Sequence, residues 1–316
     1  MNASVAKIQN CASVAISPDG ANVYTAAQGD DAIAVFDRDP ASGDLTWVEV
    51  HFDGVAGVDG LDRVFDVMVS PDGKNVYAGS IDDDAVAVFA RDPATGRLTF
   101  MEVHVNGVGG VSGLGYVVNV GMDSQGAHLY AAAKWSHAVA VFSRDPVSGA
   151  LTFFDSFFHP DLQGTSNIGI GPADASVYVS SSIGDSLLVL ARDPVTGLLT
   201  HVETHTEGIA GVTNIAGPQG VIVDPGGGLV GALSADANAI AVFRRDASTG
   251  RLEYAGAEID GVDGVDGLAD PNAGCVDSLG RSVYVAAWDD NAVSVFSLAV
   301  FIDDFETGDT SRWTVP

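Results

Sequence analysis

Two stretches decide the fold: Ser70-Pro-Asp-Gly-Lys-Asn-Val-Tyr77 and Asp84-Ala-Val-Ala-Val-Phe-Ala-Arg-Asp-Pro-Ala-Thr-Gly96. Close copies of both recur along the chain. The apolar strand in the second stretch ends in a Val-Phe or Val-Leu pair. The second residues of the six pairs, spaced by 53, 53, 48, 53 and 53 residues, are Phe36, Phe89, Phe142, Leu190, Phe243 and Phe296. A period of this size indicates one supersecondary unit that is copied many times.

The second repeat shows what that unit is. Residues 65–69, 75–80, 85–89 and 98–103 are apolar or alternating and rich in β-favouring residues, and turn residues separate them. The Pro-Asp-Gly and Arg-Asp-Pro segments are turns, and we expect the Arg and Asp of the latter to hold each other and the turn backbone. Four antiparallel strands per unit, with no helical pattern, predict an all-β propeller of four-stranded blades, six of which are seen.

These two stretches resemble the lactonase-like, YVTN-type bacterial β-propellers, a family that includes 6-phosphogluconolactonase and the fungal carboxymuconate cyclase. The resemblance covers nearly the whole chain and implies lactonase-type chemistry. The ring of this family usually has seven blades, so the chain is either a six-bladed member or a piece of a longer one. We expect one propeller domain over residues 1–298, and the tail 299–316 could supply the last outer strand.

Charge and composition exclude several classes of function. Acidic residues outnumber basic ones 42 to 14, for a net charge of −28. Nucleic acid is therefore not an expected partner, because binding it requires a basic surface. The sequence contains no run of 18 or more apolar residues, so we expect no membrane span. We expect the protein to be a monomer. The tail resembles a short ending seen on some exported bacterial proteins, so we expect an extracellular or periplasmic location, with a cytoplasmic one as the alternative. We expect Cys11 and Cys275 to be inert, buried thiols.

Propeller geometry assigns the turns between second and third strands, and the links between blades, to the face where the channel opens. Only three basic residues are expected there, namely Lys7, Arg63 and Lys134. A phosphorylated lactone or a tricarboxylate would need several converging cations, so the best-known substrates of the family fit poorly. The glycine-rich links, such as 54–61, are interpreted as packed connectors.

The same face is strongly acidic, which favours a cation. The acidic candidates for a metal site, with Ca²⁺ the possible ion, are Asp30, Asp31, Asp82, Asp83, Asp84, Asp289 and Asp290. The leading interpretation is therefore a non-catalytic binding propeller whose acidic face receives a cation, a small molecule or a basic protein. A purely structural scaffold is a third possibility.

The alternative is a lactone hydrolase or isomerase acting on a neutral or cationic lactone. His137, which replaces the usual Asp or Asn before a third strand, is the candidate general base, and Asp66 of the channel wall is the second catalytic candidate. The expected ligand or channel residues are Arg63, Tyr116, Asn119, Lys134, Trp135, Asn167, Gln219, Asn272 and Trp288. His51, His104 and His205 share one repeat position and are interpreted as surface residues of different blades.

Overall fold

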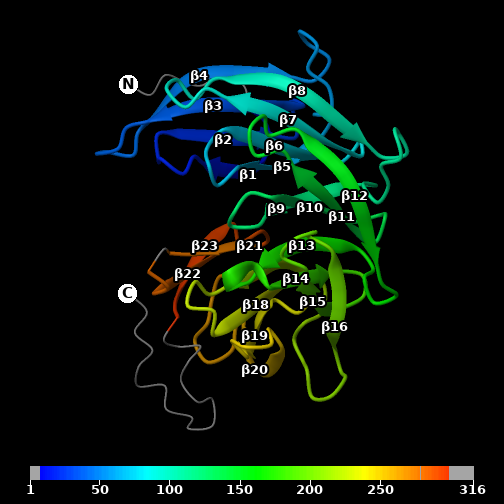
Figure 1. Cartoon of the computed structure of the whole chain (residues 1–316). Coiled ribbons are helices and arrows are strands. Elements are labelled where there is room, and N and C mark those ends of the chain that lie inside the picture. Colours follow the sequence, from blue (N-terminus) through cyan, green and yellow to red (C-terminus); the bar gives the residue numbers. More distant parts are fainter. Residues whose placement is uncertain (1–7, 278, 299–316) are drawn as a thin grey trace. The chain divides into compact units, whose positions relative to one another are not determined.

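The structure is a computed structural model and describes residues 8–277 and 279–298. Lys7 and the tail 299–316, predicted to close the last blade, lie outside the described residues. Apart from one short 3-10 helix, η1 (Pro172–Asp174), all regular elements of the described residues are β-strands (Figure 1). No helix of the described part is long and apolar enough to cross a membrane.

The chain forms two compact units, of which the first comprises Met1–His159 and Pro194–Leu198. It contains three four-stranded antiparallel sheets. Their strands are β1 (Cys11–Ile16), β2 (Asn22–Ala27), β3 (Ala32–Arg38) and β4 (Leu45–Phe52), then β5 (Val64–Val69), β6 (Asn75–Ser80), β7 (Ala85–Arg91) and β8 (Leu98–Val105), then β9 (Val117–Met122), β10 (His128–Ala133), β11 (Ala138–Arg144) and β12 (Leu151–Phe158).

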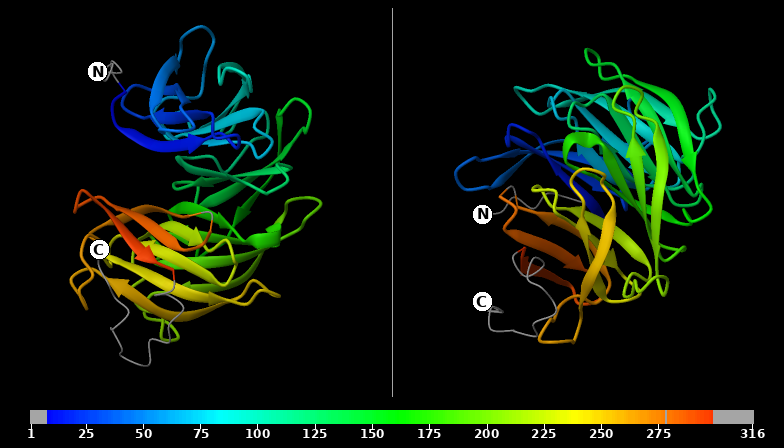
Figure 2. Two further views of the ribbon diagram at one scale, coloured as in Figure 1. Left: turned by 90° about the vertical axis from the view of Figure 1, so that its left-hand side faces the viewer. Right: turned by 60° about the horizontal axis from the view of Figure 1, so that its bottom comes forward.

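The second unit comprises Pro160–Asp193 and Leu199–Pro316. Two of its sheets have four strands and the last has three in the described residues. The strands are β13 (Thr165–Ile170), β14 (Ser176–Ser181), β15 (Ser186–Arg192) and β16 (Leu199–Thr206), then β17 (Pro218–Val223), β18 (Leu229–Ser234), β19 (Ala239–Arg245) and β20 (Leu252–Ile259), then β21 (Pro271–Val276), β22 (Ser282–Ala287) and β23 (Ala292–Ser297). Figure 2 shows the sheets of each unit stacked face to face.

Within each sheet the strands pair in chain order. The four strands predicted for the second repeat correspond to β5–β8, with β7 and β8 each two residues longer than expected. The prediction of an all-β propeller built from four-stranded antiparallel blades is confirmed, with the sixth blade three-stranded in the described residues. Each first strand also carries one extra residue, a β-bulge; in β5 the extra residue is Phe65.

The core lies between successive sheets and follows from the repeat. β7, the third strand of its blade, is apolar on both faces, and Val88 on one face and Phe89 on the other are both fully buried. The glycine-rich links contribute Val58 and Leu61, which join the core between the first two blades. Gly60 has φ +88°, and a Cβ there would lie 2.4 Å from Val103 Cγ2. Its lack of a side chain lets the link pack closely, as the interpretation of a packed connector requires.

The Arg-Asp-Pro turn differs from its predicted role. Arg91 does not pair with the neighbouring Asp92 but reaches the preceding blade, where its Nη2 contacts Asp19 at 2.9 Å and Asn22 at 2.6 Å. Asp92 accepts the backbone N–H of Ala94 instead. The sequence could not separate a contact within the turn from one with the next blade, because both residues recur at the same period.

Two smaller expectations were wrong. His51, His104 and His205 are half-buried: each contacts a glutamate two residues earlier, and their rings pack against Phe89, Phe142 and Phe243 of the following blade. Cys11 and Cys275 are free thiols but are exposed, not buried. Each lies on the first strand of a sheet, β1 or β21, and most residues of both strands are exposed.

Candidate active site

In the first two blades, the residue before the third strand positions the link that enters the next blade. Asp31 (φ 51°) accepts the backbone N–H of Arg63 at 2.8 Å, and Asp84 (φ 51°) accepts that of Tyr116 at 2.6 Å. Aspartate tolerates the left-handed conformation better than most residues, and its short carboxylate reaches the neighbouring backbone. These two predicted metal ligands therefore serve the backbone, and they place Arg63 and Tyr116 on adjacent blades.

Arg63 and Tyr116 themselves adopt unfavourable backbone conformations. Their φ angles are +48° and +65°. Two of the three corresponding positions in the second unit are Gly164 and Gly217, with φ +67° and +61°, for which this conformation carries no steric cost, and the third is Asp270, with φ +54°. A long or bulky side chain in the left-handed region costs of order 1–2 kcal/mol. Retention of such strain in two adjacent blades points to a role for the two side chains.

The side chains of these residues form an exposed row in the first unit. The Arg63 guanidinium carbon lies 5.9 Å from the centre of the Tyr116 ring, and Nη1 contacts Asp82 at 3.0 Å. The Tyr116 ring stacks on Trp135, with centroids 4.3 Å apart and planes 25° from parallel. Trp135 is 68% exposed. We call Asp82, Arg63, Tyr116 and Trp135 the aromatic–cation row.

Two more predicted residues, Lys134 and His137, belong to the β10–β11 turn that carries Trp135. The backbone N–H of Lys134 donates to the Tyr116 carbonyl at 2.9 Å, which ties the β10–β11 turn to the link before β9. Lys134 is half-buried, and His137, two residues after Trp135, is exposed. His137 has φ +51°, the same conformation as Asp31 and Asp84 at the equivalent positions. Of the group predicted in the third blade, the structure therefore brings Tyr116 and Trp135 together with Arg63.

Asp66 occupies the first strand of the second blade and is surrounded by donors. Its Oδ1 accepts the Ser13 hydroxyl at 2.6 Å and the N–H of Val67 at 2.9 Å. Its Oδ2 accepts the Asn119 amide at 2.9 Å and the N–H of Val120 at 2.8 Å. Burial raises the pKa of Asp66, although the Ser13 and backbone hydrogen bonds oppose that effect. These contacts join the first strands of three successive blades, as expected for a residue that satisfies edge-strand N–H groups.

An acidic cluster lies next to the row. One carboxylate oxygen from each of Asp53, Asp59 and Asp83 lies within 4.8 Å of the others. Asp83 also accepts the N–H of Asp62 at 2.8 Å. Partial burial and then the neighbouring carboxylates raise the pKa values of Asp62 and Asp83. Asp53 and Asp59 lie in the link before β5 and are not among the predicted metal ligands.

The other predicted metal ligands lie elsewhere. Asp30 accepts the N–H of Gln9 at 2.7 Å in the first unit. Asp289 and Asp290 belong to the second unit, where Asp290 accepts the N–H of Ala269 at 2.7 Å. Burial and then Asp289 raise the pKa of Asp270. Each unit therefore contains acidic residues from the predicted set.

The remaining predicted channel residues belong to the second unit. Asn167, like Asp66, joins its blade to the next one, because its Oδ1 accepts the N–H of Val221 at 3.1 Å. Gln219 and Asn272 are the extra residues of the bulges in β17 and β21. Trp288 is 70% exposed and is the first residue of the β22–β23 turn, the position that Lys134 takes in the third blade.

The family of the chain is decided by its sequence. Residues 1–113, 56–161 and 158–267 match the family described as Lactonase, 7-bladed beta-propeller. Together these stretches cover most of the chain. The protein belongs to this lactonase family. The family description gives seven blades, whereas the described residues of this member form six sheets. A search of the curated proteins finds no match to this lactonase-family chain.

Solved structures agree with this assignment at the level of the fold. A candidate 6-phosphogluconolactonase from Bacteroides fragilis is 20% identical, with a TM-score of 0.74 over 92% of this chain and 81% of the other. A candidate 6-phosphogluconolactonase from Bacteroides uniformis is 17% identical, with a TM-score of 0.75 over 93% of this chain and 82% of the other. The periplasmic gluconolactonase of Pseudomonas aeruginosa is 20% identical, with a TM-score of 0.73 over 91% of this chain and 81% of the other.

Sequence reasoning missed one unusual carboxylate of this lactonase-family chain. Glu258, on β20, is 3% exposed, and among the described residues its Oε1 has no hydrogen-bond partner. Burial and then the charge of Asp263 raise the pKa of Glu258 to about 7. Glu258 pairs with Ile240 as His205 pairs with Leu187, so it occupies the repeat position of the three histidines. The replacement of this histidine by a glutamate is visible when the repeats are aligned, but the burial of the Glu258 side chain is not.

Proposed function

We propose that the protein hydrolyses a neutral, sugar-like lactone. The observation that carries this proposal is the family match across residues 1–267. Two similar structures are candidate 6-phosphogluconolactonases and a third is a periplasmic gluconolactonase, which supports lactone chemistry. The proposal therefore favours the enzymatic alternative over a non-catalytic binding propeller.

The charges around the aromatic–cation row support a neutral substrate. Arg63 is already paired with Asp82, and Asp53, Asp59 and Asp83 add negative charge nearby. A phosphorylated lactone would be repelled by this acidic surface and would lack converging cations. Exposed aromatic rings such as Trp135, with a few polar groups beside them, suit the apolar face of a sugar ring.

The proposed chemistry needs only water and protein groups. His137 takes a proton from water as the hydroxyl oxygen adds to the lactone carbonyl carbon. The Arg63 guanidinium stabilises the negative charge that develops on the carbonyl oxygen. The ring C–O bond then breaks, and the departing alkoxide receives the proton from His137, which yields the hydroxy acid. Asp66, whose two oxygens accept four hydrogen bonds, positions the first strands of the blades in this scheme.

The test measures hydrolysis of gluconolactone and of its 6-phosphate against the buffer rate, because lactones also open spontaneously. We expect turnover of the neutral lactone, a loss of at least 100-fold in kcat/KM for His137→Ala, and a raised KM for Trp135→Ala. His205→Gln, a histidine of the second unit outside this group, should leave the rate unchanged. Absence of enzymatic rate with every lactone tested would rule out the proposal.

Cation binding is a second candidate function, and the Asp53, Asp59 and Asp83 cluster favours it. Calcium takes carboxylate oxygens in flexible geometry, and extracellular modules bind it at about 10⁻⁴–10⁻³ M. That affinity would suit the exported location expected from the sequence. Calorimetric titration of EDTA-treated protein with Ca²⁺ tests this function. Saturable heat that Asp59→Asn removes would support it, and absence of heat at millimolar Ca²⁺ would exclude it.

A further inference from the structure

The fourth blade departs from the repeat in ways that lactone hydrolysis does not explain. The link before β13 lacks the glycine pattern of the other links. On β16, His201 occupies a repeat position that is aromatic in four other blades, namely Trp47, Phe100, Phe153 and Tyr254. Those aromatic rings pack on the Phe of the third strand, whereas His201 is opposite Leu190. The substitution and the unusual link occur in the same blade.

A bulge in β16 brings the polar side chains of this blade together. His201 is opposite Leu190 and Thr204 is opposite Leu188, with Val202 as the extra residue between them. Leu190 and Leu188 share one face of β15, so His201 and Thr204 share a face of β16. His201 Nε2 lies 2.8 Å from Thr204 Oγ1, and that hydroxyl donates to Asp161 Oδ2 at 2.9 Å.

This hydrogen-bond chain determines the tautomer of His201. Because the Thr204 hydroxyl gives its proton to Asp161, it accepts from His201 Nε2. The neutral imidazole then carries its lone pair on Nδ1. Fixing one ring nitrogen as a donor so that the other can act as a ligand is the usual task of an outer-shell partner at a metal centre.

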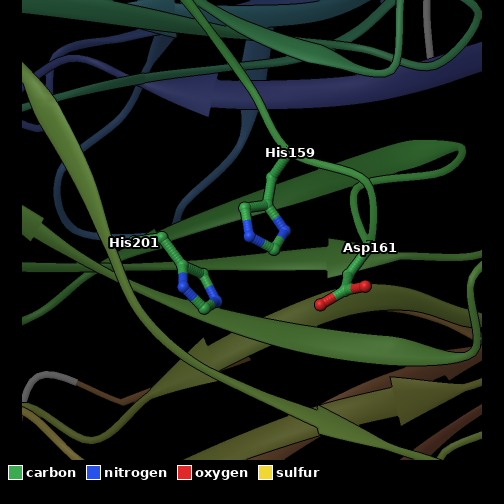
Figure 3. A group of neighbouring side chains, drawn as sticks. All are labelled: His159, Asp161 and His201. Atoms are coloured by element: carbon green, nitrogen blue, oxygen red, sulfur yellow. The ribbon is translucent and has the colours of Figure 1, made fainter.

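His159 completes the group. Pro160 alone separates it from Asp161, so the covalent chain holds the two side chains close together. Its ring is stacked parallel to Phe157, with an interplanar angle of 3°. His159, Asp161 and His201 each offer one ligand atom, and these atoms lie within 4.8 Å of one another. Figure 3 shows the three side chains converging.

We propose that His159, Asp161 and His201 bind a divalent transition-metal ion, with Zn²⁺ the preferred ion. Two imidazoles and one carboxylate suit zinc, nickel or copper, whereas Ca²⁺ and Mg²⁺ prefer oxygen ligands alone. Ligand bonds of about 2.1 Å place ligand atoms roughly 3–3.5 Å apart, so small side-chain rotations close the site. Asp161 is exposed and both histidines are half-buried, which leaves room for that adjustment and for water on the ion.

The experiment is calorimetric titration of untagged, EDTA-treated full-length protein with Zn²⁺, together with the absorption spectrum of the Co²⁺ form. We expect one ion per chain, a raised melting temperature and the intense visible bands of low-coordinate cobalt. His201→Phe restores the aromatic residue of the other blades, so its fold should be retained while zinc affinity falls at least tenfold. Asp161→Asn should act in the same direction, and Thr204→Val should weaken binding about tenfold.

His205→Gln is the matched control, because it removes the other β16 histidine and leaves the cluster intact. The metal-free melting temperature of each variant separates loss of a ligand from loss of the fold. The proposal is overturned if wild-type protein shows no saturable zinc binding, or if His201→Phe and Asp161→Asn bind zinc as tightly as wild type. Lactone turnover plays no part in the measurement, so either result leaves the proposed hydrolysis to be judged by its own test.

Discussion

Arg91 donates a hydrogen bond of 2.7 Å from its Nε to the hydroxyl of Tyr24, which lies 67 residues earlier, in the preceding blade. Tyr24 in turn donates to the Gly96 carbonyl at 2.8 Å, in the turn that follows Arg91. The same pair recurs at Arg144 and Tyr77, at 2.6 Å. Burial raises the pKa values of both tyrosines to about 12, so the hydroxyls stay protonated. Each arginine therefore fastens one blade to the blade before it.

Replacement of such an arginine should be costly. The Arg144 side chain is 1% exposed and also contacts Asp72 at 3.0 Å and Asn75 at 2.8 Å. We expect Arg144→Met to lower the free energy of unfolding by about 3 kcal/mol, because buried partners lose their donor. Arg97→Met, at a 57% exposed side chain paired with Glu49, should cost less than about 1 kcal/mol. Urea unfolding of both variants checks this, and equal losses would contradict the inter-blade role.

Asp66 offers a second test of the scaffold. Its four hydrogen-bond donors require two acceptor oxygens, and Asp66→Asn replaces one oxygen by a donor. We expect a loss of about 2 kcal/mol in the free energy of unfolding. Asp59→Asn, at an exposed link position, is the matched control and should change stability little. If Asp66→Asn were as stable as wild type yet inactive, a catalytic role would replace the structural one.

The strain at Arg63 can be measured separately from its function. Arg63→Gly should change the free energy of unfolding by less than about 1 kcal/mol, because relief of the left-handed conformation offsets the lost contact with Asp82. Arg63→Ala keeps the strain and loses the side chain, so it should be about 1 kcal/mol less stable than the glycine variant. Both should raise KM for the lactone. Thermal unfolding and steady-state kinetics on the pair provide the check.

Glu258 predicts how stability depends on pH. Its pKa is about 7 in the folded protein against an ordinary value of 4.5, so the folded state keeps a proton that the unfolded chain releases between these values. Stability should therefore fall as pH rises from 4.5 to 7. Glu258→Gln should remove that decline and raise the free energy of unfolding at pH 8 by about 2 kcal/mol. Denaturation curves at pH 5 and pH 8 test this, and parallel pH profiles for variant and wild type would refute it.

The strands were predictable because the repeat reports the same pattern six times. Period-2 alternation and the Pro-Asp-Gly turn located β5–β8 to within two residues at their ends. The role of Arg91 was not predictable, since a residue that recurs in every blade makes the same sequence pattern whether it contacts its own turn or the next blade. Register, burial and the partner of a long side chain are properties of packing.

The candidate site was predictable in part. Arg63, Tyr116 and Trp135 were expected at one face because their loops share it, but their stacking depends on positive φ angles that the sequence does not reveal. His201 escaped notice because it follows Asp161 by 40 residues and sits within an outer strand. Its signal was a departure from the repeat, a histidine where four blades have an aromatic residue.

The residues before the third strands also bear on the charge of the protein. Asp185 accepts the N–H of Gly217 at 2.8 Å, as Asp31 and Asp84 do with their own links, whereas Asn238 does the same for Asp270 at 2.9 Å. A neutral amide thus already performs the task of these carboxylates. Part of the net charge of −28 is a by-product of turn geometry, and surface charge can be altered at these positions without loss of the architecture.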